Sequence, residues 1–206
     1  MTEEEIRIRR HHIPDDEVWQ RSHNTWKQLK PRLNFNYRLD PSNETPLEYS
    51  QRIISIFNNI PIDVLLQWQF EHIYDLDMVN NYGWINYHQV TFNLVYWSEK
   101  EFSKVQIFSG FKDYVDRKSY ISNFEHLSCT DEDKDHWRHF GTWLVPIIVL
   151  KTENMINIPS YAELNCPYQL VEGHTRFGNY NAIKCLSEQG KVQISNKHKV
   201  FLMSVS

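Results

Sequence analysis

The stretch Tyr168-Gln-Leu-Val-Glu-Gly-His-Thr-Arg-Phe-Gly178, near the C-terminal end of the chain, joins a strand signal, a polar turn and the start of a helix. It opens with an apolar run typical of a strand, and the residues that follow it continue as a helix through Leu186 to a stop at Gly190. The five residues after the strand therefore lie where that helix begins. A helix N-terminus presents backbone N–H groups and a partial positive charge, and both favour an anion such as phosphate.

The side chains of this turn are suited to phosphate chemistry. Gly173 lets a ligand approach the backbone, and the guanidinium of Arg176 can bind two phosphate oxygens at once. Thr175 could cap the helix and contact the same phosphate. We predict catalytic roles for His174, as acid or base near neutral pH, and for Glu172, which could hold Mg²⁺ or orient the imidazole. The simpler alternative is a strand-turn-helix connection whose polar residues only cap the helix and face water.

The placement of glycine supports a turn that another group approaches closely. The chain has only 6 glycines, and three of them are close together in sequence, at Gly141, Gly173 and Gly178. A glycine inside a helix costs about 1 kcal/mol relative to alanine. We therefore expect the helix at Gly178 to be approached closely by another backbone or by a ligand.

Length and composition limit the class of protein. With 206 residues, 41% of them apolar and 14% aromatic, the chain can bury the core of one large or two small domains. No apolar run is long enough to span a membrane, and the acidic start does not resemble a secretory signal. Three scattered cysteines indicate no disulfide framework, so we expect a cytoplasmic protein. The net charge of −4 argues against a protein that coats nucleic acid non-specifically.

The segments over 1–128 predict a mainly helical region with at least one strand. Thr45 with Glu48, and Ser98 with Glu101, have the spacing of capping boxes, and Asp63 could cap a further helix. The run at 7–12 is cationic and is expected to be a solvated arm. The strand over 89–97 is expected to turn its even-numbered apolar residues to one face. The predicted helices cover 14–29, 45–57, 63–80, 98–110 and 112–126.

The region over 129–206 predicts a mixed α/β core, which gives the whole chain an α+β fold. Thr130 caps a helix that ends at Gly141, and a buried strand follows over 142–150, with Pro146 marking an edge or a bulge. An irregular segment then leads to the opening strand, its turn and its helix. A last strand is expected over 199–205.

The order of these elements resembles the nucleotide-binding core of the ParB/sulfiredoxin superfamily, over about residues 130–205. Pro146-Ile-Ile-Val149 and Gly173-His-Thr-Arg176 stand where ParB-type chains have Pro-Ile-Val-Val and Gly-Glu-Arg-Arg. The resemblance implies that the turn binds the phosphates of a nucleotide. It also implies that His139 and Thr142 line the pocket, because the superfamily's site borders this junction.

The branches of the superfamily differ at the turn. Sulfiredoxins carry Gly-Cys-His-Arg with a nucleophilic cysteine, and His174 stands at that place here, which argues against peroxiredoxin repair. ParB partition proteins continue into a helix-turn-helix and a dimerisation domain, for which the chain after Arg176 is too short. Free-serine kinases carry Asp-Gly-His-His-Arg, and the sequence from Glu172 to Arg176 is most similar to this branch.

The resemblance therefore implies a protein that binds ATP or another nucleotide with Mg²⁺ and acts as a phosphotransferase or NTP hydrolase. The expected partner is a nucleotide or another phosphate-bearing small molecule, and a homodimer is compatible with the sequence. One alternative is a ParB-like module that binds or cleaves DNA. Another is a regulatory protein without catalysis, since a fold does not fix a function.

Two other groups of residues could bind a metal, and each has a simpler interpretation. Four residues have a spacing that could form a tetrahedral zinc site: His126, Cys129, His136 and His139. Such a spacing also arises by chance in a chain with 10 histidines. Glu71 and Asp75 are four apart on a predicted helix, but such pairs usually form the hydrated side of the helix. We therefore predict no metal site built from protein side chains alone.

Overall fold

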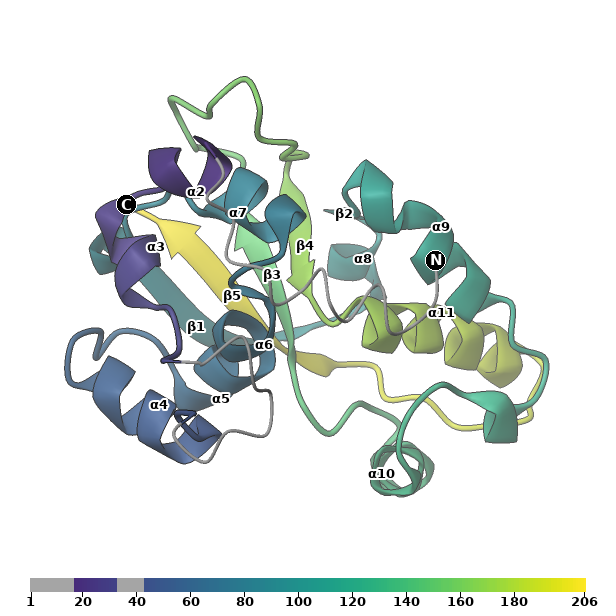
Figure 1. The fold of residues 1–206 in the computed structure, drawn as a ribbon. Coiled ribbons are helices and arrows are strands. Elements are labelled where there is room, and N and C mark those ends of the chain that lie inside the picture. Colours follow the sequence, from purple (N-terminus) through teal and green to yellow (C-terminus); the bar gives the residue numbers. More distant parts are fainter. Residues whose placement is uncertain (1–16, 33–42) are drawn as a thin grey trace. The chain divides into compact units, whose positions relative to one another are not determined.

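The computed structural model describes residues 17–32 and 43–206, which form two compact units (Figure 1). The first unit contains the described chain up to Phe92, together with Ile156–Glu163 and Val205–Ser206, and the second contains Asn93–Met155 and Leu164–Ser204. Helices and a five-stranded sheet are both present, which confirms the predicted α+β class. The cationic run at 7–12 and the helix start predicted at 14–16 lie outside the described residues.

The first unit is built from short helices. Where one helix was predicted through residue 29, two form, because Ser22 and His23 separate them and His23 caps the second. The capping box of Thr45 and Glu48 is confirmed at the start of α4, with Pro46 as its first residue. The bounds are α2 Glu17–Arg21, α3 Asn24–Gln28, α4 Pro46–Ile54, α5 Ile62–Val64, η1 Leu65–Gln69, α6 Phe70–His72, α7 Leu76–Tyr82 and η2 Tyr87–Gln89.

The single helix predicted over 63–80 is wrong in two respects. Pro61, not Asp63, occupies the N-cap position, and the run then passes through a π-helical turn at η1. The run ends at His72, and extended backbone at Asp75 (ψ 124°) starts α7 as a new helix. Asp75 therefore does not share a helix face with Glu71, and it pairs instead with Nδ1 of His72 at 2.9 Å.

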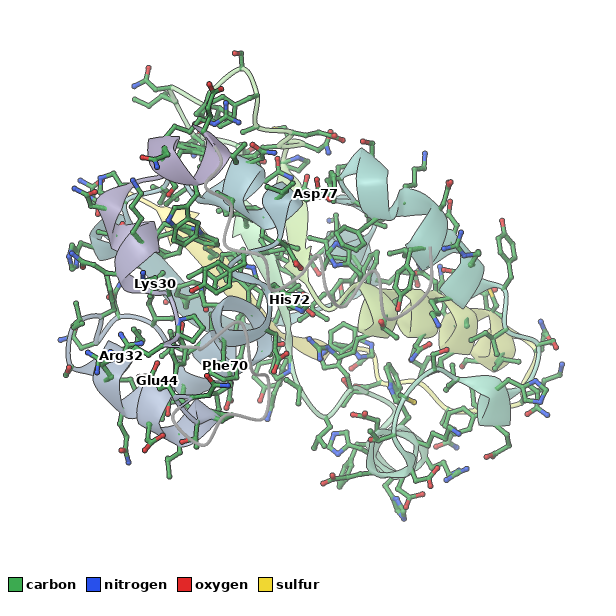
Figure 2. The ribbon with its side chains drawn as sticks, viewed as in Figure 1. Lys30, Arg32, Glu44, Phe70, His72 and Asp77 are labelled. Atoms are coloured by element: carbon green, nitrogen blue, oxygen red, sulfur yellow. The ribbon has the colours of Figure 1, made fainter. Side chains whose placement is uncertain are left out.

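An ion pair fastens the segment before α4 to that helix. Arg52 contacts Glu44 through two N–O pairs of 2.6 and 2.7 Å, and its Nη2 also donates to the carbonyl of Lys30 at 2.9 Å. The backbone N–H of Arg32 donates to the same carboxylate at 2.9 Å (Figure 2). Burial alone would raise the pKa of Glu44, but the hydrogen bonds from Arg52 and Arg32 lower it on balance.

Aromatic side chains fill the core of the first unit. The ring of Trp26 lies 5.9 Å from that of Trp68 and 5.5 Å from that of Tyr87, and all three side chains are fully buried. Near α4, Phe70 packs on Tyr49 with ring centroids 5.1 Å apart. These contacts join α3, α4, η1, α6 and η2.

The sheet has the strand order β1-β5-β3-β4-β2. β3 is central: it runs parallel to β5 and antiparallel to β4, whereas β2 pairs parallel with β4. The strands predicted at 89–97, 168–172 and 199–205 are confirmed. The bounds are β1 Val90–Trp97, β2 Val105–Gln106, β3 Ile147–Lys151, β4 Tyr168–Glu172 and β5 His198–Val205. The boundary predicted between residues 128 and 129 falls inside the second unit, because β2 and most of β1 precede it there.

Two strand predictions need correction. β3 begins only at Ile147, and Pro146 precedes it, because proline has no N–H for the ladders on either side of a central strand. On β1, the alternation predicted an apolar face but does not mark the buried one, because Leu94 and Tyr96 on that face are 50% and 60% exposed. The residues of β1 that pack on the core of the second unit are Val95 and Trp97, and Val90 at the start of the strand is also buried.

Helices pack against this sheet in the second unit. The capping boxes of Ser98 with Glu101 and of Thr130 with Asp133 are present, and Gly141 ends α10 at φ 63°. The helix predicted over 98–110 is only one turn long, because the chain leaves it to pair as β2. The helix predicted over 112–126 starts earlier and stops at residue 119. The bounds are α8 Glu99–Phe102, α9 Ser109–Ser119, η3 Phe124–His126, α10 Asp131–Phe140 and α11 His174–Glu188.

No helix in the described part of the chain is long and apolar enough to cross a membrane.

Two buried glutamines give a paired test of hydrogen-bond satisfaction. Gln69 is fully buried, and its amide atoms have no hydrogen-bond partner among the described residues. Gln169 is equally buried, but its Oε1 accepts from the backbone and side chain of Asn165 at 3.1 and 3.0 Å. We expect Gln69→Met to leave the free energy of unfolding unchanged or to raise it, and Gln169→Met to lower it by about 1–3 kcal/mol. Urea unfolding measures the free energy of unfolding of both variants. Equal losses in the two variants would contradict the view that only Gln169 is stabilised by its hydrogen bonds.

Candidate functional site

The predicted turn joins the end of β4 to the start of α11 (Figure 1). Gly173 is the N-cap of α11 and has left-handed backbone angles, φ 98° and ψ 28°. A Cβ built on it would lie 2.5 Å from Cγ2 and 2.9 Å from Cβ of Ile147 on β3. No side chain larger than glycine fits this position without displacing the central strand. The close approach expected at Gly173 is thus made by the protein's own β3.

The N-terminus of α11 is capped by no side chain at its N-cap residue. The helix has 15 residues, and its first backbone hydrogen bond runs from the N–H of Phe177 to the carbonyl of Gly173 at 2.8 Å. The N–H groups of the first turn therefore point out of the helix along its axis, toward the turn. Thr175 does not cap the helix as predicted, because it lies inside the first turn and its hydroxyl is bonded elsewhere.

Arg176 is held in the first turn, largely out of water. Its side chain is 24% exposed, and Nη2 lies 4.0 Å from Oε1 of Glu172. Burial lowers the pKa of Arg176, and the negative charges of Glu172 and Asp133 oppose that shift. A guanidinium stays protonated under these conditions. The turn therefore combines a partly dehydrated positive charge with two nearby carboxylates.

Helix α9 covers the other side chains of the turn. The imidazole of His174 is buried and stacks on Phe111, with centroids 4.3 Å apart and an interplanar angle of 25°. The hydroxyl of Thr175 shares a 2.7 Å hydrogen bond with that of Tyr114. Phe111 and Tyr114 were not predicted at the site, since they lie some sixty positions before their partners in the chain. Their three-residue spacing, which puts both on one side of a helix, was the only available signal.

Gly178 explains how α9 comes so close. A Cβ on Gly178 would lie 2.5 Å from Cβ of Lys118 and 3.0 Å from the carbonyl oxygen of Val115, both on α9. The expectation of close approach at this glycine is confirmed, and the approaching group is another helix backbone. The two glycines of the turn region therefore set its contacts with β3 and with α9.

The two predicted pocket residues outside the turn have other partners in the described structure. His139 is exposed, and its Nδ1 lies 2.7 Å from the carbonyl oxygen of Asp135 on its own helix. Thr142 shares a 2.8 Å hydrogen bond with Nδ1 of His198 at the start of β5. No contact of either residue with the turn is seen among the described residues. The residues brought together at the turn are Glu172, Gly173, His174, Thr175 and Arg176, with Phe111, Tyr114 and Ile147 against them.

In the described residues, no three His, Cys, Asp or Glu side chains are placed to hold a metal ion. The zinc spacing noted around Cys129 therefore does not form a site there. A Mg²⁺ ion that arrives with a nucleotide needs fewer protein ligands, because it keeps waters and phosphate oxygens and takes only one or two carboxylates. Glu172 is the carboxylate at the turn that could serve it.

Comparison of the chain with models of known protein families, with curated proteins and with solved structures finds no match. What the turn does is therefore inferred from the residues that form it.

The contact at Gly173 predicts a large loss of stability on substitution. Gly173→Ala combines a left-handed backbone, which costs about 1–2 kcal/mol for an L-residue, with a clash against Ile147 that adds about 1–3 kcal/mol. Gly190→Ala is the matched control, because Gly190 also has positive φ (71°) but nothing lies within 4 Å of its Cβ position. Thermal or urea unfolding should show the larger loss for Gly173→Ala. Equal losses of stability in Gly173→Ala and Gly190→Ala would show that the contact with Ile147 adds nothing to the effect of the positive φ.

His198 predicts a loss of stability in mild acid. Its ring is buried among Phe102, Trp137, Trp143 and Tyr180, and burial lowers its pKa from 6.5 to about 4. Below pH 6.5, His198 binds a proton in the unfolded chain but stays neutral in the folded chain until the pH approaches 4. The contribution of His198 to the free energy of unfolding is therefore fully present above pH 6.5. It is lost as the pH falls toward 4, by at most about 3 kcal/mol.

The measurement for His198 is urea unfolding at pH 5 and pH 7.5 of the wild type and of His198→Gln. We expect the variant to lose less stability between the two pH values, because it lacks the titrating group. An equal fall in both proteins would show that other groups produce the acid sensitivity.

Proposed function

We propose that this protein binds the phosphate groups of a nucleotide at the turn between β4 and α11. The observation that carries the proposal is the position of Arg176, a largely buried cation in the first turn of a 15-residue helix whose N-cap is a glycine. A phosphate placed before α11 would receive the helix N–H groups and a two-pronged contact from the guanidinium.

The two carboxylates near Arg176 favour a phosphate that arrives with a divalent cation. Glu172 and Asp133 both act electrostatically on the guanidinium, so a bare anion at the turn would also be repelled by them. A Mg²⁺–nucleotide complex reduces that repulsion, and Glu172 can join the metal's ligands. This supports a nucleotide with Mg²⁺, ATP in the first instance, over free inorganic phosphate.

A reaction at this site would be phosphoryl transfer or NTP hydrolysis. His174 is the general acid or base in this proposal, and its stacking on Phe111 holds the ring in one orientation. Glu172 orients the imidazole or the metal. The order α10, β3, β4, turn, α11 is the order on which the resemblance to the ParB/sulfiredoxin superfamily rests, and it supports a nucleotide as ligand.

The test is the melting temperature with ATP, ADP, CTP and GTP, each with and without Mg²⁺. A nucleotide at about 100 times its Kd adds about 2.7 kcal/mol, which raises the melting temperature of a chain this size by roughly 5–10 °C. We expect Arg176→Ala to abolish the rise and Arg176→Lys, which keeps the charge but loses the fork, to reduce it. Arg138→Ala is the control, because Arg138 is an exposed arginine paired with Glu125 and Asp135 on and near α10.

A rise that persists in Arg176→Ala, or no rise with any nucleotide, would refute the proposal. Binding of duplex DNA that weakens with salt and survives Arg176→Ala would instead favour the DNA-binding alternative.

A further inference from the structure

The two edges of the sheet are unequal. β2 forms one edge and has only two residues, Val105 and Gln106. β1 forms the other edge and has eight residues (Figure 1). An edge strand offers a row of backbone N–H and C=O groups to any other strand, and natural proteins protect such edges. β2 is protected from pairing with another strand because it is only two residues long.

β1 has few of the protections that natural edge strands use. Its sequence, Val-Thr-Phe-Asn-Leu-Val-Tyr-Trp, contains no charged residue and no proline. Every residue from Thr91 to Tyr96 is exposed or half-exposed. Leu94 and Tyr96 point to the same face, since they are two apart on a strand, and both are large apolar side chains open to water.

Among the described residues, hydrogen bonds from outside the sheet reach β1 only at its first residue. The side-chain amide of Asn59 donates to the carbonyl oxygen of Val90 at 2.7 Å. From Thr91 to Trp97, no described residue outside the sheet makes a hydrogen bond to the strand. Along this length, no part of the chain that the structure describes outside the sheet is hydrogen-bonded to the outer edge of β1.

We propose that β1 is the interface of a homodimer, in which the β1 strands of two copies pair antiparallel across a two-fold axis. The sheets of both copies would then form one continuous sheet. A second copy fits this edge because the strand carries no charge, so nothing repels an identical strand and nothing selects a charged partner. An antiparallel pair with the axis at Leu94 places Leu94 beside its own copy and Tyr96 beside Phe92 of the second copy. These are cross-strand apolar pairs on one face of the sheet.

The first test is the mass of the full chain in solution. Sedimentation equilibrium at micromolar concentrations should give twice the chain mass of 24.9 kDa. Leu94→Lys places two like charges next to each other at the axis and should raise the dimer dissociation constant at least about tenfold. Ile156→Lys is the control, since Ile156 is 78% exposed outside the sheet and should leave the dimer unchanged. Both substitutions are at exposed side chains, and thermal melts confirm that the variants fold.

The second test fixes the register. Leu94→Cys, in a chain whose Cys129, Cys166 and Cys185 are replaced by serine, should form a disulfide-linked dimer on mild oxidation, because the axis brings the two thiols together. Ile156→Cys in the same background should not. A wild-type chain that stays monomeric overturns the proposal. A dimer that Leu94→Lys does not weaken, or that Leu94→Cys does not cross-link, overturns the assignment to β1.

Discussion

The contact between Gly173 and Ile147 is the constraint on which the candidate site depends. The chain passes so close to the central strand that only a glycine fits, and the positive φ of Gly173 directs the chain from β4 into α11. The start of α11 is therefore fixed by the left-handed backbone of Gly173 and by its packing against Ile147 on β3. The N-cap residue provides no side-chain hydrogen bond to the helix. Arg176 lies three residues after Gly173, in the first turn of α11, so its position relative to β3 is set by the same contact.

A second close approach completes the frame of the turn. Gly178 lets α9 approach α11 closely, through Cβ of Lys118 and the carbonyl oxygen of Val115, and α9 then brings Phe111 onto His174 and Tyr114 onto Thr175. His174 and Thr175 are thereby each held by a neighbour from α9. An arrangement of this kind reduces the motion of the groups that would contact a ligand, which is what preorganisation requires.

Local signals in the sequence predicted local structure well. The capping boxes at Thr45 and Ser98, the N-cap at Thr130 and the glycine stop at Gly141 were all found, because each depends on residues within one helical turn. The sequence failed where distant contacts decide. The buried and exposed residues of β1 depend on which side of the strand meets the core. The break in the helix over 63–80 is local, since extended backbone at Asp75 starts a new helix and Asp75 pairs with His72 three positions before it. The turn itself was located correctly, but Phe111 and Tyr114 could not be assigned to it before the packing of α9 was known.

The way the chain is divided between the two units has a consequence for its synthesis. The first unit includes Ile156–Glu163 and Val205–Ser206, so the chain leaves that unit after Phe92 and returns to it twice. The N-H and hydroxyl of Ser206 both donate to the carbonyl oxygen of Gln89, at 3.1 and 3.0 Å. During translation the N-terminal helices emerge long before these partners exist, so the first unit reaches the contacts described here only after residues 205–206 have been synthesised. Its maturation is thus tied to the completion of the second unit, and no contiguous fragment contains either unit alone.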